Sequence, residues 1–331
     1  MKTKILYVLV SDSDDFYAEQ LYISLVSLRR NSPGAVATVL TDQTTHEALA
    51  TRGKVGKRLL EAANNWVVAP LDPSSTKELR SRMLKTGMRQ YVEGDFLFID
   101  TDTIIARPLD GIDSIPCELA LCLDHHCRLQ DNPEKDSIQA KCLQIGEDLS
   151  QKDLYFNSGV ILARDTAEVR DFFSLWQKNY LLGRESGIKT DQQSLAKTIN
   201  GNSFNVGQLG GEWNCQLPYG VRYMGKAIVF HYFAGNSAKS GEQLFLLNDA
   251  HALARTRDSE QIPDDVSAVI EDFFKGLPEV SLLIGKQDMD FRTTRRYKDL
   301  KRSFVPGKFS FLEFFLKVRA RLPFTNRRQA K

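Results

Sequence analysis

The chain has 331 residues, of which 42% are hydrophobic and 26% are charged, and its formal net charge is +2. This length provides one large domain or two smaller ones with a sizeable core, and the composition is that of a soluble globular protein. No segment approaches the run of about eighteen apolar residues that a membrane-spanning helix needs, so the sequence excludes an integral helical membrane protein.

The charge is distributed unevenly along the chain. From Phe291 onward thirteen Lys and Arg residues face two acidic residues, which gives this tail +11 and leaves −9 for the rest. A basic tail on an acidic body indicates an anionic partner, either a membrane or a nucleic acid. Plotted as a helix, residues 308–322 gather their apolar side chains on one side. This pattern is typical of an amphipathic helix on an anionic lipid surface or of a terminal helix packed on the domain.

The five cysteines indicate free thiols in a reducing compartment, because an odd number in a large chain does not suggest a disulfide framework. The apolar run near the N-terminus is too short for a signal peptide. We therefore expect a cytoplasmic protein. Cysteines and histidines between Cys117 and Cys142 match no paired-cysteine zinc pattern, so zinc is not expected.

Strands and helices alternate over the first 70 residues. The predicted strands are Ile5–Val10, Ala35–Leu40 and Trp66–Val68, and a helix with leucines at helical spacing follows the first. Such alternation predicts a parallel sheet with helices on both faces. Asp12 stands at the exit of the first strand, where it either contacts a nucleotide base or ribose or caps the next helix.

A predicted helix over Ser75–Tyr91 carries a basic face. Arg82, Lys85 and Arg89 recur at helical spacing along it. The face either supplies a cation to a phosphate or sugar, or is simply solvated.

Two acids follow the strand after this helix. Phe96–Ile99 read as a strand buried on both faces, and Asp100 and Asp102 come directly after it. Ligands of open α/β sheets bind at the carboxyl ends of the strands. Acids two residues apart lean to the same side and repel each other unless a cation lies between them. The pattern predicts a divalent metal that holds a diphosphate, with capping of a turn as the alternative.

Three polar sites follow further strands or open a helix. Asn157 and Ser158 interrupt a predicted strand before Gly159, and Asp191 with Gln192 opens a helix, as a cap or facing a sugar. His231 follows an apolar strand. With two carboxylates, its imidazole forms a ligand set that suits manganese better than magnesium.

Together these motifs resemble the retaining glycosyltransferase family eight, which contains glycogenin and the bacterial lipopolysaccharide galactosyltransferases. The resemblance runs in order over residues 5–240. It rests on Phe98-Ile99-Asp100-Thr101-Asp102, Phe156-Asn157-Ser158-Gly159-Val160, Asp191-Gln192, Glu212-Trp213-Asn214 and His231. It implies a GT-A fold, that is, a Rossmann-like nucleotide-diphospho-sugar transferase with a mixed, mainly parallel sheet, helices on both faces and a C-terminal helical tail.

The resemblance also implies roles for individual residues. Asp100, Asp102 and His231 would hold Mn²⁺ or Mg²⁺, Asp12 would contact uracil, and Asp191 and Gln192 would act beside the donor sugar. The residues implied to bind the UDP-sugar are Asp12, Arg82, Asp100, Thr101, Asn157, Ser158 and Lys239. The implied reaction moves a hexose to a hydroxyl of a glycan or glycolipid, as in lipopolysaccharide biosynthesis, with retention.

We therefore expect a catalytic domain over residues 1–245 and a C-terminal helical extension with a basic tail over residues 246–331. Contact of the tail with the inner face of the membrane is the expected partner interaction, and no nucleic acid is expected, because such a partner leaves the ordered acidic motifs unexplained. The first alternative function is a nucleotidyltransferase, because such an enzyme also binds a divalent metal and a diphosphate. A sugar-nucleotide-binding protein without turnover is the second alternative.

Overall fold

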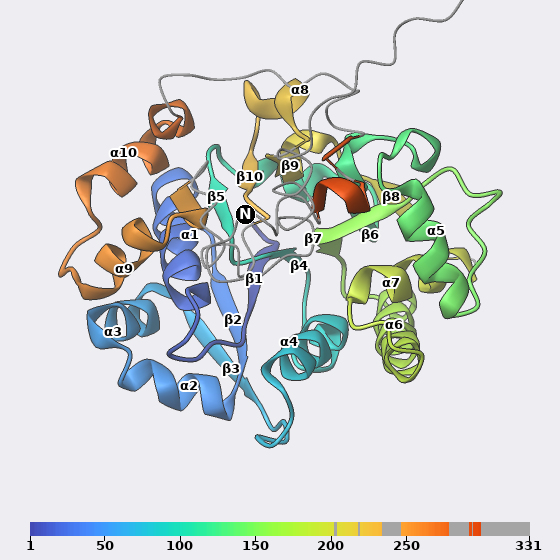
Figure 1. The fold of residues 1–331 in the computed structure, drawn as a ribbon. Coiled ribbons are helices and arrows are strands. Elements are labelled where there is room, and N and C mark those ends of the chain that lie inside the picture. Colours follow the sequence, from blue (N-terminus) through green and yellow to red (C-terminus); the bar gives the residue numbers. More distant parts are fainter. Residues whose placement is uncertain (202–203, 218, 234–245, 278–290, 293, 299–331) are drawn as a thin grey trace, which may run out of the picture. The chain divides into compact units, whose positions relative to one another are not determined.

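The computed structural model of the protein describes residues 1–201, 204–217, 219–233, 246–277, 291–292 and 294–298. The chain divides into two compact units, Met1–Glu279 and Val280–Lys331. All elements described below belong to the first unit (Figure 1). Within the described residues no helix is both long and apolar enough to cross a membrane. The predicted amphipathic segment at residues 308–322 lies outside the described residues.

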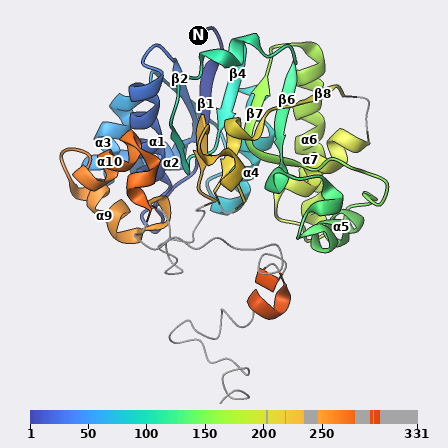
Figure 2. The ribbon, with the colours of Figure 1, turned by 90° about the horizontal axis from the view of Figure 1, so that it is seen from above.

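The first unit contains a seven-stranded sheet in the order β3-β2-β1-β4-β7-β6-β8 (Figure 2). Its strands are β1 (Lys4–Leu9), β2 (Ala37–Asp42), β3 (Asn65–Ala69), β4 (Phe96–Ile99), β6 (Leu119–Leu123), β7 (Phe156–Ala163) and β8 (Val206–Gln208). Strands β1 to β4 are mutually parallel, β7 runs antiparallel to β4 and β6, and β8 runs parallel to β6. The predicted mixed, mainly parallel sheet is confirmed.

Helices cover both faces of this sheet, as predicted (Figure 1). One face packs against α1 (Tyr17–Asn31), α2 (Gln43–Ala50) and α3 (Gly53–Ala62), and the other against α4 (Lys77–Thr86), α6 (Ala167–Glu185) and α7 (Asp191–Asn200). Alternate residues of a strand point to opposite faces. In β4, Leu97 joins the first core and Phe98 the second, which explains why this strand is apolar throughout.

A second, three-stranded sheet consists of β5 (Thr103–Ile105), β10 (Val229–His231) and β9 (Cys215–Gln216) in that order. Strand β5 pairs antiparallel with β10, so that Thr103 faces His231, and the amide of Tyr232 donates to the carbonyl of Asp102 at 2.9 Å. Because the chain changes sheets between β4 and β5, the two acids lie at the junction of the sheets.

The remaining helices of the first unit are α5 (Lys135–Gln144), α8 (Val221–Met224), α9 (Ala250–Asp258) and α10 (Asp264–Glu271). Helix α5 lies in the connection between β6 and β7. Helices α9 and α10 pack against α1 through an apolar cluster that includes Ile23, Leu253 and Val266. The predicted domain boundary after residue 245 falls at the end of a segment outside the described residues and stays a prediction.

The predicted helix over Ser75–Tyr91 is wrong in its last turn. Helix α4 ends at Thr86, Gly87 follows, and a short 3₁₀ turn begins at Met88. A Cβ at residue 87 would lie 2.2 Å from the side-chain amide of Gln177 on α6 and 3.0 Å from the carbonyl of Met83, so the Gln177 side chain would have to move to admit a larger residue there. Arg89 is therefore not on the α4 face.

Arg89 is buried and joins the segment before β4 to the end of β7. Its guanidinium donates to the carbonyls of Val92 (3.2 Å), Gly94 (2.7 Å), Ala163 (3.0 Å) and Arg164 (3.1 Å). Burial lowers its pKa to about 10.

We predict that Arg89→Met lowers the free energy of unfolding by about 2–3 kcal/mol, because four carbonyls lose a charged donor. Urea unfolding followed by circular dichroism measures the loss. Arg170→Met serves as the control, since that side chain is 48% exposed and its removal should cost less than about 1 kcal/mol. Equal stability of Arg89→Met and the wild type would contradict a structural role.

Candidate functional site

Three side chains with metal-binding atoms converge at the junction of the two sheets. One ligand atom from each of Asp100, Asp102 and His231 lies within 4.8 Å of the others. The Nε2 atom of His231 is 3.4 Å from Asp102 Oδ1 and 3.8 Å from Asp100 Oδ2. The pairing of β5 with β10 brings the histidine to acids more than a hundred residues earlier in the chain. The sequence predicted this set of three.

The chemistry of the three groups fits a divalent cation. Burial and the nearby Asp102 raise the pKa of Asp100, while Lys85 and His231 act in the opposite direction. Such strain between adjacent acids is relieved by a cation between them. Oxygen and imidazole ligands together suit Mn²⁺, and the two carboxylates also suit Mg²⁺.

Gly159 of β7 makes room for the imidazole. A Cβ at this position would lie 2.3 Å from Cε1 and 2.7 Å from Nδ1 of His231, distances that real side chains do not adopt. The carbonyl of Gly159 also accepts a hydrogen bond from the amide of Asp100 at 2.9 Å. One glycine therefore sets the separation between the histidine and the first acid.

A buried chain of polar side chains orients the imidazole from behind. Nδ1 of His231 lies 2.9 Å from Oδ1 of Asn214, whose amide nitrogen donates to Asn157 Oδ1 at 2.9 Å. Asn157 in turn donates to Asp124 Oδ1 at 3.0 Å. Because the Asn214 amide nitrogen is used by Asn157, its oxygen faces the imidazole and accepts from Nδ1–H. The lone pair of Nε2 then points to the acids, which is the tautomer that a metal requires.

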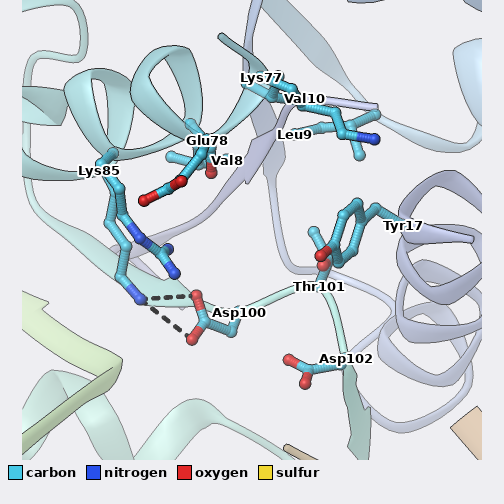
Figure 3. A pocket seen from close by; sticks show the side chains of 12 residues that line it. Val8, Leu9, Val10, Tyr17, Lys77, Glu78, Lys85, Asp100, Thr101 and Asp102 are labelled. Atoms are coloured by element: carbon cyan, nitrogen blue, oxygen red, sulfur yellow. Dashed lines mark hydrogen bonds and ion pairs between the residues drawn. The ribbon is translucent and has the colours of Figure 1, made fainter. Parts of the chain in front are cut away.

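On the other side of Asp100 lies a pair of cations from α4. Lys85 Nζ is 3.0 Å and 3.1 Å from the two oxygens of Asp100 (Figure 3). It also lies 3.7 Å from Asp191. Arg82 Nε is 3.1 Å from Asp191, which also accepts a hydrogen bond from Ser158 Oγ at 2.9 Å. The basic face predicted for this helix is therefore directed, at Arg82 and Lys85, toward the acidic cluster.

A cavity of about 370 Å³ opens beside this cluster, at the carboxyl ends of β1 and β4 (Figure 3). Its wall combines cationic side chains of α4 with acids of the β4–β5 turn and the ring of Tyr17 at the start of α1. The lining residues are Val8, Leu9, Val10, Tyr17, Lys77, Glu78, Ser81, Arg82, Lys85, Asp100, Thr101 and Asp102. This is the edge of an open α/β sheet where ligands bind.

Asp12 stands beside this cavity without lining it. Its Oδ2 atom is 2.8 Å from Nζ of the cavity residue Lys77, and its side chain is 46% exposed. Burial opposes ionisation, yet hydrogen bonds led by that of Lys77 lower the pKa of Asp12. Helix α1 begins at Tyr17 with Phe16 at its N-cap, so Asp12 does not cap the helix, which was one of its two predicted roles.

The other predicted residues lie in different settings. Asn157 and Ser158 are buried, and Asn157 spends its hydrogen bonds on Gly159, Asn214 and Asp124. Gln192 follows Asp191 in α7 and is half-buried. Lys239 lies outside the described residues.

The cysteines and histidines considered for zinc do not form a metal site in the described part of the chain. All five cysteines are free thiols. In the described ranges, the acids Asp100 and Asp102 with His231 are the one group of three metal-capable residues.

Sequence reasoning missed four residues of the site. Lys85 had been noted only as part of the basic face that supplies a cation or is solvated, and Asn214 only within a motif, without a contact to any site residue. Tyr17 and Lys77 had no signal, because an aromatic and a lysine in the first turns of helices are ordinary. Only the packing of α1 and α4 against the carboxyl ends of β1 and β4 identifies them.

Comparison with solved structures finds the same fold over most of the chain. The galactosyltransferase LgtC, solved with donor and acceptor sugar analogs, superposes with a TM-score of 0.50 at 14% identity, over 80% of this chain and 99% of LgtC. An active-site mutant of LgtC gives 0.50 at 15% identity, over 76% and 95%. Mouse xyloside xylosyltransferase 1 in its apo form gives 0.46 at 13%, over 71% and 99%.

No family model matches the sequence, and no curated protein matches it either. At 14–15% identity the likeness to LgtC is a likeness of fold. The chain therefore has the GT-A-like α/β fold that its motifs predicted.

We predict that Asn214→Leu weakens Mn²⁺ binding by about tenfold or more, because the imidazole loses the acceptor that fixes its tautomer. Electron paramagnetic resonance of free Mn²⁺ during a titration measures the affinity. Asn205→Leu is the control, since that residue is exposed. Asn214→Asp keeps an oxygen toward Nδ1 and should lose less. An Asn214→Leu affinity within about twofold of the wild type would rule out the orienting role.

A second prediction concerns pH. Burial opposes the ionisation of Asp191, but Arg82, Lys85 and Ser158 hold its pKa at about 2, below the ordinary 3.8. Ionised Asp191 therefore stabilises the fold fully above its ordinary pKa, and this contribution disappears as the pH falls toward 2. In Asp191→Asn the free energy of unfolding should fall less steeply between about pH 5 and pH 3 than in the wild type. Urea titrations across that range measure the slope, and an unchanged slope would contradict the assignment.

Proposed function

We propose that the protein is a metal-dependent glycosyltransferase that moves a hexose from a UDP-sugar to a hydroxyl of a glycan or glycolipid. The observation that carries the proposal is the convergence of Asp100, Asp102 and His231 beside a cavity lined by cations. The fold of LgtC, a galactosyltransferase solved with donor and acceptor sugar analogs, supports it. A nucleotide-sugar is a ligand that uses both an acidic metal site and a basic wall.

Asp100, Asp102 and His231 would hold the metal, with Mn²⁺ favoured over Mg²⁺ because one ligand is an imidazole. When bound, the metal supplies positive charge where the departing diphosphate becomes more negative. The lysine and arginine of α4 add to that field. Lys85 is only 5% exposed, and a buried cation at short range acts more strongly than one in water.

The nucleotide would lie at the carboxyl end of β1. We assign base recognition to Asp12, whose carboxylate is exposed next to Lys77. The ring of Tyr17 in the cavity wall gives the base an aromatic face to stack on. Thr101 and Lys239 remain proposed donor contacts.

Asp191 and Gln192 would position the donor sugar. The Asp191 carboxylate is held from three directions by Arg82, Lys85 and Ser158, so it offers a fixed acceptor for a sugar hydroxyl. Asn157 and Ser158 would act from behind, because both are buried.

We propose retention by front-face attack. The acceptor oxygen bonds to the anomeric carbon on the side from which the diphosphate leaves, the bond to the phosphate oxygen breaks, and that oxygen takes the acceptor proton. This route needs no carboxylate nucleophile of the kind that retaining glycosidases use.

We infer the class of acceptor, and where in the cell the enzyme acts, from the basic C-terminal tail. A basic amphipathic segment at residues 308–322 would bring the enzyme to the inner face of a membrane, where lipid-linked acceptors of lipopolysaccharide biosynthesis are found. The protein would otherwise be cytoplasmic and would not bind nucleic acid.

The test is incubation with Mn²⁺ and a panel of sugar nucleotides. Release of UDP supports sugar transfer, release of a sugar 1-phosphate indicates transfer of the nucleotidyl group by a nucleotidyltransferase, and binding without cleavage indicates a sugar-nucleotide-binding protein. Asp102→Asn should reduce UDP release by about a hundredfold or more, because a metal ligand is lost. Asp171→Asn, an exposed aspartate on α6, should retain wild-type activity. Full activity of Asp102→Asn would refute the metal assignment.

A further inference from the structure

The segment from Ser11 to Phe16 connects β1 to α1 and carries the proposed base-recognition residue. It has no helix or strand of its own. Its backbone carbonyls at Asp12 and Asp15 are instead bound by guanidinium groups from other parts of the chain. The conformation of this loop therefore depends on cations that the rest of the fold presents to it.

The first of these cations is Arg52, at the N-cap of α3. It donates to both oxygens of Glu19, at 2.9 Å and 2.7 Å, and to Ser11 Oγ at 2.9 Å. It also donates to the carbonyls of Asp12 and Asp15. Glu19 is completely buried in the first turn of α1. This bidentate pair fixes the start of α1 against α3.

The second cation is Arg257, near the end of α9. It shares Glu19 with Arg52, donating to Oε1 at 2.7 Å, and it donates to the carbonyl of Asp15 at 2.7 Å. Its guanidinium carbon also lies 4.8 Å above the ring of Phe16. Helix α9 follows residue 245, the last residue of the predicted catalytic domain.

The two arginines differ in what they support. Glu19 keeps its bidentate partner Arg52 when Arg257 is removed, so no buried charge is left unpaired. Arg257 is itself 25% exposed at the outer side of the cluster. What it alone supplies is a second donor to Asp15 and a cover over Phe16, which are the last two residues before Tyr17.

Lys77 binds the loop from the cavity side. Its Nζ atom lies 2.8 Å from both Asp12 and Asp15. The acid Asp15 is thus held through its side chain by α4 and through its carbonyl by α9. A shift of the loop would move Asp12 away from Lys77 and the ring of Tyr17 away from the cavity.

We propose that Arg257 is a positioning residue for donor binding: helix α9 holds the loop at residues 11–16 in the conformation in which Asp12 and Tyr17 receive the base of a nucleoside diphosphate. This inference rests on the proposed function. It makes a helix of the C-terminal extension part of the donor site, although no side chain of that helix lines the cavity.

The experiment compares UDP binding in the presence of Mn²⁺ by isothermal titration calorimetry. Arg257→Met removes the guanidinium with its hydrogen bonds and its contact with the Phe16 ring, and we expect about tenfold weaker UDP binding with kcat changed by less than about twofold. Arg255→Met is the matched control on the same helix, because its exposed side chain pairs with Asp265 at the surface. Its UDP affinity should equal that of the wild type.

A double-mutant cycle distinguishes positioning from general destabilisation. In an Asp12→Asn background, Arg257→Met should weaken UDP binding less than in the wild type, because the residue acts through the loop that carries Asp12. Full additivity of the two effects, or an unchanged UDP affinity in Arg257→Met, would overturn the proposal.

Hydrogen exchange of the peptide covering residues 10–17, measured without any ligand, tests whether Arg257 holds the loop in place. Exchange should be faster in Arg257→Met and unchanged in Arg255→Met. Wild-type protein that binds no UDP would refute the proposed function, whereas unchanged exchange in Arg257→Met would refute the positioning role of Arg257. The two failures are therefore distinguishable.

Discussion

The site depends on two carboxylates held close together where one sheet ends and another begins. Asp100 and Asp102 repel each other, and the fold answers with positive or metal-binding groups on both sides, Lys85 from α4 and His231 from β10. The acids cannot separate, because the turn between them is fixed by β4 on one side and β5 on the other. A cleft built in this way favours a divalent cation, and the basic wall beside it favours the phosphates that such a cation binds.

The second sheet explains how residues distant in sequence reach the acids. Pairing of β5 with β10 places His231 opposite Thr103, next to the two acids. Gly159 determines how closely the ring of His231 can approach β7. The polar chain through Asn214 and Asn157 then fixes the ring's orientation. Each of these contacts is buried, and a buried polar group without a partner is costly. Orientation and stability are therefore provided by the same hydrogen bonds.

Cations from several elements also shape the side of the cavity formed by the carboxyl end of β1 and the start of α1. Arg52, Lys77 and Arg257 bind a loop that has no regular structure, and Arg82 with Lys85 keeps Asp191 ionised despite its burial. The charges of the site form one connected arrangement that runs from α9 through α1 and α4 to α7. The uneven charge of the whole chain gave no indication of this internal balance.

The sequence by itself determined the alternation of strands and helices, the buried strand before Asp100 and the three metal-capable residues, because these depend on local apolar patterns and on the exits of strands. Only the tertiary structure decided that β7 runs antiparallel, that residues 103–105 enter a second sheet, and that Arg89 turns away from α4. It also identified Lys85, Asn214 and Arg257, whose roles depend on partners far along the chain. Hydrogen bonds and ion pairs between distant segments leave no periodic signal in a sequence, which is the physical reason for the difference.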